Sequence, residues 1–130
     1  MKTIYDIINL KKQYSNLEDD ATFMRLVAWY KYTIDEGLIL TEYKGDKLQG
    51  FIEWIRLERV PDDINDIKPN YDCIHTAPVL FVINAVAKNM ATYKRLIKEV
   101  KNRNKDREYS AFYRSKDGRM RVIKDGGKNG

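Results

Sequence analysis

The chain has 130 residues, of which 43% are hydrophobic and 12% aromatic, and its net charge is +5. A chain of this length forms one domain and can bury a hydrophobic core. The single cysteine and single histidine exclude an internal disulfide and a thiolate metal cluster, so no metal site is predicted. No apolar run is long enough to span a membrane and the N-terminus lacks signal-peptide features, so we expect a cytoplasmic protein without a membrane partner.

Charge is distributed unevenly along the sequence. Residues 1–93 hold 11 basic and 14 acidic side chains, whereas residues 94–130 hold 13 basic and 5 acidic ones. The positive C-terminal third would attract nucleic acid, phosphate groups or an acidic protein surface. A solvated surface without a ligand is the alternative interpretation, and the sequence does not separate the two.

Two amphipathic helices are predicted at the start of the chain. Isoleucines at 4, 7 and 8 share one face of a helix over residues 3–14. A second helix over 21–36 has apolar residues at the same spacing. Asp19 or Asp20 can cap its start, and Gly37 supplies the left-handed residue that ends it.

A β-hairpin and a long loop follow. The β-rich runs 38–43 and 48–59 flank the turn KGDK, and the second run is apolar on both faces, as in a central strand. Residues 60–78 contain all three prolines and no periodic apolar pattern. A connection of this length is often functional, although a plain surface loop fits the sequence equally well.

A strand and a third helix come next. Val79–Ala87 is almost continuously apolar, which is typical of a central strand. Asn89 can cap a helix that runs to about Asn104. The residues predicted to form the buried stripe of this helix are Met90, Tyr93, Leu96, Ile97 and Val100.

A second hairpin closes the domain. Its strands are predicted at 109–114 and 119–123, around the turn SKDG in which Gly118 takes a positive φ. Residues 124–130 are expected to be a flexible tail. The order α-α-β-β-β-α-β-β predicts a single α+β domain over residues 1–123, with helices packed against a mainly antiparallel sheet.

This order of elements resembles the GNAT N-acetyltransferase superfamily over about residues 4–123. GFIEWIRL is similar to the third strand of that fold, PVLFVINAV to its fourth strand and ATYKRLIKEV to the next helix. The resemblance implies an acyltransferase-like protein that uses acetyl-CoA or another acyl thioester. GNAT enzymes carry an Arg/Gln-x-x-Gly-x-Gly/Ala turn for the cofactor pyrophosphate, whereas this chain reads AVAKNMATYK, without glycine.

Two divergent groups share features with the chain. Toxin-activating lysine acyltransferases also have a degenerate turn, and APVLFVINAVAKNMATYKRLIKEV is similar to their central strand and helix. Their catalytic histidine lies near the N-terminus, where this chain has none, so their activity is not implied. GNAT-like proteins of phages resemble the chain in size and composition, which implies a phage-infected bacterial cell, with virion association as one alternative.

The GNAT resemblance implies a donor site along the central strand and at the start of the next helix. The strand backbone would hold the thioester arm, the helix amides would take a phosphate, and basic side chains would add charge. The implied residues are Val82, Asn84, Val86, Lys88, Asn89, Met90, Ala91, Thr92, Lys94 and Arg95.

The resemblance also implies two catalytic residues. Glu53 is the candidate general base and Tyr113 the candidate acid that protonates the leaving thiolate. Glu53 and Glu58 are five positions apart on one strand, so they face opposite sides of the sheet. A solvent-facing carboxylate and a core tyrosine are the plainer interpretations of these residues.

The long loop offers two further candidates. Asp72 can orient the imidazole of His75, and Cys73 can act as a nucleophile if its pKa is lowered. A surface histidine and an inert thiol are the alternatives.

A second function therefore stays open. A catalytically inactive protein of the same fold would bind nucleic acid or an acidic protein partner through residues 94–121. Its basic residues are Lys94, Arg95, Lys98, Lys101, Arg103, Lys105, Arg107, Arg114, Lys116, Arg119 and Arg121. No interleaved stacking aromatics accompany them, as nucleic-acid binding would favour.

Overall fold

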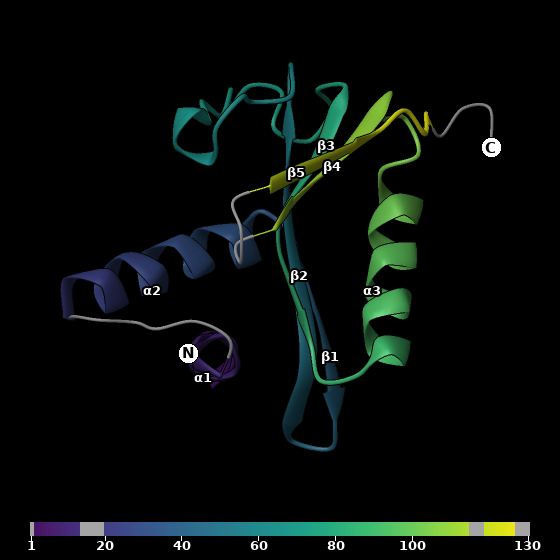
Figure 1. Cartoon of the computed structure of the whole chain (residues 1–130). Helices are drawn as coiled ribbons and strands as arrows, with labels where there is room; N and C mark the ends of the chain where they lie inside the picture. The colour runs from purple at the N-terminus through teal and green to yellow at the C-terminus, as the bar shows by residue number, and fades with distance from the viewer. Residues whose placement is uncertain (1, 14–19, 115–118, 127–130) are drawn as a thin grey trace.

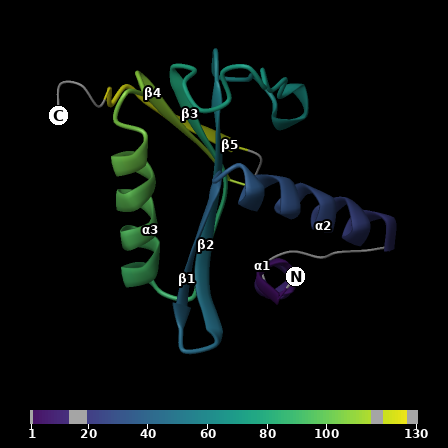
Figure 2. The same cartoon turned by 180° about the vertical axis from the view of Figure 1, so that it is seen from behind.

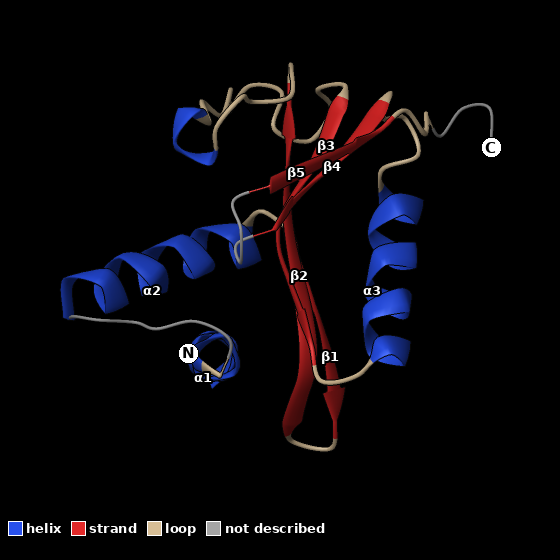
Figure 3. Cartoon of the chain, in the orientation of Figure 1, coloured by secondary structure: helices blue, strands red, loops and turns tan. Residues whose placement is uncertain are grey.

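The computed structural model describes residues 2–13, 20–114 and 119–126. Within these ranges it has the element order that the sequence predicts (Figure 3). The elements are α1 (Lys2–Lys12), α2 (Asp20–Asp35), β1 (Ile39–Lys44), β2 (Lys47–Leu57), a short 3-10 helix (Ile64–Asp66), β3 (Val79–Ala87), α3 (Met90–Arg103), β4 (Tyr109–Arg114) and β5 (Arg119–Ile123). None of the described helices is long and apolar enough to cross a membrane.

The helices lie on both faces of one sheet. α1 and α2 cover one face and α3 covers the other, as the two opposite views show (Figures 1 and 2). On the α1–α2 side, Ile7, Tyr30 and Phe51 are among the buried residues, and on the α3 side Leu96 and Val100 pack against the strands. The predicted α+β class is therefore confirmed.

The sheet is mainly antiparallel. Its strand order is β1-β2-β3-β4-β5, and only β3 and β4, which α3 connects, are parallel. Every residue from Phe51 to Leu57 of β2 is buried, which confirms the prediction of a central strand with two covered faces. Gly37 follows α2 with a φ of 70°, as predicted. Gly118, predicted to take a positive φ in the second hairpin, lies outside the described residues.

β3 contains one extra residue opposite β2. Glu53 pairs with Asn84 and Trp54 pairs with Val82, so Ile83 has no counterpart on β2. Such a bulge bends the strand that carries it. The register between β3 and β4 ends at Val82 and Phe112, while β3 continues to Ala87. β4 and β5 therefore turn away from the second half of β3 (Figure 1).

The start of α3 packs closely on β2 at a glycine. Asn89 is the N-cap, as predicted, and its side chain accepts a hydrogen bond from the Thr92 amide. A Cβ on Gly50 would lie 2.8 Å from both Thr92 Cγ2 and the carbonyl oxygen of Val86. Only a residue without a side chain fits between the helix and β3 here.

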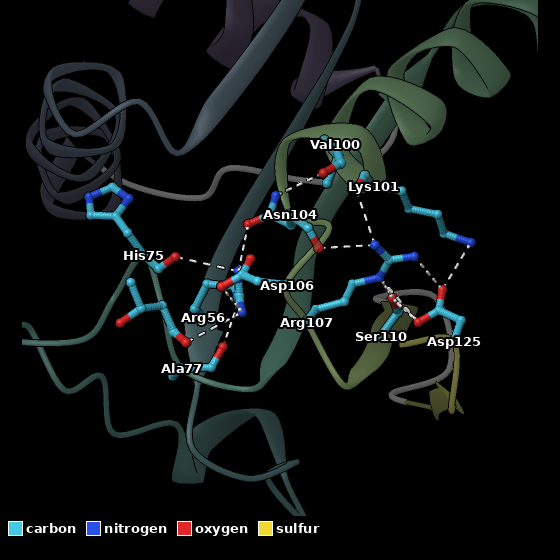
Figure 4. A network of polar contacts seen from close by, with 11 residues as sticks. Arg56, His75, Ala77, Val100, Lys101, Asn104, Asp106, Arg107, Ser110 and Asp125 are labelled. Carbon is cyan, nitrogen blue, oxygen red and sulfur yellow. Dashed lines mark hydrogen bonds and ion pairs between the residues drawn. The ribbon is translucent and has the colours of Figure 1, made fainter. Parts of the chain in front are cut away.

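Two buried arginines hold the other end of α3 (Figure 4). Arg107 donates to the carbonyl oxygens of Lys101 and Asn104, each at 3.0 Å, and its Nη2 lies 3.1 Å from Asp125 Oδ2. Arg56, only 1% exposed, donates to Asn104 Oδ1 and Asp106 Oδ1 at 3.2 and 2.9 Å. Cationic side chains satisfy the last carbonyl groups of a helix and interact favourably with the negative end of its dipole.

The structure corrects three predictions about this part of the chain. Arg107, expected on a basic surface, is buried inside the fold. Asp125, expected in a flexible tail, is fixed by Arg107, whereas residues 127–130 lie outside the described ranges. Met90 and Tyr93, expected in the buried stripe of α3, are 64% and 37% exposed. Thr92 is buried in their place because the helix turns that side toward Gly50.

We expect the Gly50→Ala variant to lower the free energy of unfolding by about 1–3 kcal/mol, because the added methyl group overpacks a backbone contact. Urea denaturation measures the change. Gly126→Ala is the matched control, since a Cβ there meets its nearest atoms at 3.5 Å. Equal stability of the two variants would contradict the tight fit at Gly50.

Candidate functional site

A cavity of about 840 Å³ lies in the wedge between β3 and β4, which we call the wedge cavity. Val82–Val86 of β3 form one side of it. Tyr93, Ile97 and Lys101, spaced four residues apart on one face of α3, form the second side. The β4–β5 hairpin forms the third side with Phe112, Tyr113, Arg114, Arg119, Met120, Arg121 and Ile123.

The open edge of β3 presents backbone groups to the wedge cavity. The Lys88 amide donates to the Gln49 carbonyl oxygen at 2.9 Å, so position 88 faces β2. Backbone groups alternate between the two neighbours of a strand. By this alternation the backbone groups of Val86 and Asn84 also face β2, and those of Ala85, which lines the wedge cavity, face away from β2.

This placement changes the expected set of strand residues. Val82, Asn84 and Val86 were predicted to offer their backbone along one edge, as every second residue does in a regular strand. The bulge at Ile83 shifts that alternation. We therefore carry Ala85 forward for backbone contacts, while Asn84 still lines the wedge cavity.

The start of α3 is occupied by the protein's own contacts. The Thr92 amide donates to Asn89 Oδ1 at 2.9 Å, and the Thr92 hydroxyl donates to Glu42 Oε2 of β1 at 2.7 Å. Arg95 donates to both oxygens of Glu42, each at 2.7 Å. Thr92 and Arg95, both expected to bind a donor phosphate, instead fasten α3 to β1.

The remaining residues of the expected phosphate site do not line the wedge cavity. Lys88, Asn89, Met90, Ala91 and Lys94 are exposed at the end of β3 and the first turn of α3. The structure thus brings Val82, Asn84, Val86 and Tyr113 together around the wedge cavity, and leaves the helix start outside it.

We expect the contacts of Glu42 to contribute stability that acid removes. Hydrogen bonds from Arg95 and Thr92 lower the pKa of Glu42 from its usual value to about 2. A depressed folded-state pKa stabilises the fold above the unfolded-state pKa and loses that effect as pH falls toward about 2.

Glu42→Gln should therefore flatten the fall in stability between about pH 4.5 and 2, measured by urea denaturation at a series of pH values. Glu99→Gln, in an exposed pair with Arg103, is the control and should keep the wild-type slope. An unchanged slope in Glu42→Gln would contradict the role of this carboxylate.

Glu53 is buried and hydrogen-bonds to Asn84, a residue that lines the wedge cavity. It is 0% exposed, accepts from Trp29 Nε1 at 2.6 Å and accepts from Asn84 Nδ2 at 2.8 Å. Burial raises the pKa of Glu53, while the hydrogen bonds and the nearby charge of Lys11 oppose that rise. Glu53 is not among the residues that line the wedge cavity, and its role as general base stays a prediction.

Tyr113 is half-buried and lines the wedge cavity, and its role as the acid stays a prediction. Sequence reasoning missed Trp29 and Ala85. A tryptophan on the sheet-facing side of a helix that also carries a run of apolar residues gives no signal that its indole N–H binds a buried acid.

The candidates of the long loop are not brought together as expected. His75 Nε2 lies 3.3 Å from Oε2 of Glu36, the residue that follows α2. Burial and the negative charge of Glu58 raise the pKa of Cys73, which disfavours the thiolate that a nucleophile needs. No cluster of His, Cys, Asp or Glu suited to a metal ion occurs among the described residues.

The basic residues of 94–121 do not form one continuous surface. Arg95 pairs with Glu42, Arg103 with Glu99, and both Lys101 and Arg107 with Asp125. Lys116 lies outside the described residues. Arg114, Arg119 and Arg121, together with Lys101, gather around the wedge cavity.

No protein-family model matches the chain, and no curated protein matches it. Among solved structures, it is similar to a predicted acetyltransferase from Clostridium acetobutylicum that was crystallised with acetyl-CoA. The identity is 19%, the match covers 89% of this chain and 79% of that one, and the TM-score is 0.49. Similarity at this level assigns no role to any residue of the wedge cavity.

Proposed function

We propose that the protein transfers an acyl group from a thioester donor to an amine, with the donor bound in the wedge cavity. The observation that supports this most is the separation of β3 from β4 beyond Val82. It leaves the backbone groups of Ala85 facing a cavity instead of a strand. An open strand edge binds an extended amide-containing chain through backbone hydrogen bonds. The pantetheine arm of CoA or of acyl carrier protein is such a chain.

The charge around the wedge cavity supports an anionic donor. Lys101, Arg119 and Arg121 are among its lining residues, and no carboxylate side chain is among them in the described part of the chain. The start of α3 lacks a glycine turn and is held by Glu42. We therefore assign the phosphate of the donor to side chains of the β4–β5 hairpin rather than to helix amides.

The reaction requires no metal or covalent enzyme intermediate. The amine nitrogen attacks the thioester carbonyl carbon, a C–N bond forms, the C–S bond breaks, and the sulfur leaves as a thiolate. The nitrogen loses one proton and the sulfur gains one, so the products are an amide and a thiol. The hydroxyl of Tyr113 is the candidate proton donor to the thiolate, because it lines the same cavity.

The alternative is an inactive protein that binds nucleic acid or an acidic partner, in a phage-infected cell or on a virion. The absence of glycine at the β3–α3 turn favours it. Arg95, Arg103 and Arg107 have acidic partners of their own, which leaves them less available to such a partner. Phage origin and virion association stay predictions from the sequence.

A bulky side chain should block the wedge cavity. We expect calorimetry to detect binding of acetyl-CoA or a longer acyl-CoA to the wild type, and Ile97→Trp to weaken it at least tenfold because Ile97 lines the cavity. Met24→Trp, on the exposed face of α2, is the control and should bind as the wild type does. Absence of binding to the wild type at millimolar ligand, by calorimetry and thermal shift, would refute the proposed function.

Charge reversal separates the two candidate functions. Arg121→Glu should weaken acyl-CoA binding about tenfold or more and reduce its dependence on salt, whereas Lys105→Glu, outside the cavity, should change little. If both variants instead weaken binding of DNA or RNA equally while acyl-CoA does not bind, the inactive alternative is correct.

A further inference from the structure

Asn84 stands between the wedge cavity and a buried carboxylate. Asn84 is among the residues that line the wedge cavity, and its Nδ2 donates to Glu53 Oε1 at 2.8 Å. The other oxygen of Glu53 accepts from Trp29 Nε1 at 2.6 Å. Three elements, α2, β2 and β3, therefore meet in one chain of hydrogen bonds that ends at the cavity wall.

The donors and acceptors along this chain of hydrogen bonds can be assigned from Trp29 onward. An indole N–H can only donate, so one oxygen of Glu53 must accept from Trp29. The second oxygen of the carboxylate accepts from the NH₂ group of Asn84. Because its NH₂ group is the part of the amide that binds Glu53, Asn84 Oδ1 is left to accept from another donor.

We infer that Trp29 and Glu53 fix the amide of Asn84 so that Oδ1 faces the wedge cavity and accepts an N–H from the acyl acceptor, a primary amine. The inference rests on the proposed function and names its acceptor class. Asn84 orients the nitrogen, while Glu53 and Trp29 are positioning residues that do not touch it. An asparagine cannot take up a proton, so the amine must reach the cavity uncharged or lose its proton to solvent.

The charges around the wedge cavity agree with this role. Lys101, Arg114, Arg119 and Arg121 line it and favour the anionic donor, but they disfavour a nitrogen that gains positive charge during attack. Asn84 differs from these cations because it hydrogen-bonds to a carboxylate, that of Glu53. The acceptor nitrogen is therefore best placed against Asn84, on the β3 side of the cavity.

The variant Glu53→Gln provides a sharp test because it reverses the chain of hydrogen bonds. Trp29 still requires an acceptor, so the new amide places its oxygen toward Trp29 and its NH₂ group toward Asn84. Asn84 must then turn Oδ1 to that NH₂ group and present Nδ2 to the wedge cavity. A second donor facing the amine should raise KM for the amine about tenfold or more, with the Kd of acyl-CoA unchanged.

The double variant Glu53→Gln with Asn84→Asp should restore the wild-type pattern. One oxygen of the new Asp accepts from the Gln, and the other faces the wedge cavity as an acceptor. We expect KM for the amine to return to within about threefold of the wild type. Glu58→Gln, on an exposed residue beyond the end of the same strand, is the matched control and should leave KM unchanged.

Two kinetic results would each overturn the inference. One is a wild-type KM in Glu53→Gln, and the other is a double variant no better than that single variant, both with wild-type melting temperature and acyl-CoA Kd. NMR of the Asn84 side-chain NH₂ group checks the orientation without any activity. The group should exchange slowly with solvent in the wild type and rapidly in Glu53→Gln, and rapid exchange in both would also overturn the inference. A wild type that fails to bind acyl-CoA, yet protects this NH₂ group, refutes the proposed function instead.

Discussion

The extra residue of β3 determines the shape of the candidate site. A regular strand at this position would pair with β2 on one edge and with β4 on the other along its whole length. The bulge at Ile83 keeps the β2 pairing as far as Gly50 and Ala87 but ends the β4 pairing at Val82. The bulge that separates β3 from β4 also changes which backbone groups of β3 face the space between them. A cavity between strands is then possible without any loss of order in the core.

The helix beside the opening is fastened at both ends. At its start, Thr92 and Arg95 bind Glu42 of β1, and Gly50 allows the helix to approach β2 closely. At its end, Arg107 binds the last carbonyl oxygens and Asp125. Because α3 cannot slide toward β4, the space left by the separated strands stays open. Residues that resemble ligand-binding cations in the sequence thus maintain the site without lining it.

The sequence predicts the elements well because they depend on local periodicity. β3, β4 and β5 have the expected boundaries, and α3 begins after the expected cap at Asn89. The details of the site depend instead on pairing between distant segments. Whether Arg95 meets a ligand or Glu42 depends on the position of β1, 53 residues earlier in the chain. The bulge likewise depends on the register of β2 against β3, which no pattern within either strand specifies.

The same limit applies to the burial of charged groups. Arg107 has charged neighbours in the sequence, as a solvent-facing residue does, and Glu53 lies in an apolar strand that does not show which groups would pair with its charge. Their burial follows from partners on other elements, Trp29 and Asn84 for Glu53 and Asp125 for Arg107. A single sequence shows a charge but not its partner, so it overestimates the number of charges available to a ligand.

The turn between β3 and α3, without glycine and closed by Asn89, has a consequence for how an anion is recognised. A glycine loop surrounds phosphate oxygens with rigid amides and so selects for shape. Arginine and lysine side chains on a hairpin move with the ligand and read mainly its charge. In the proposed function, such a pocket would tolerate carriers with different headgroups, from a nucleotide to a carrier protein, and ordinary salts would compete strongly with them.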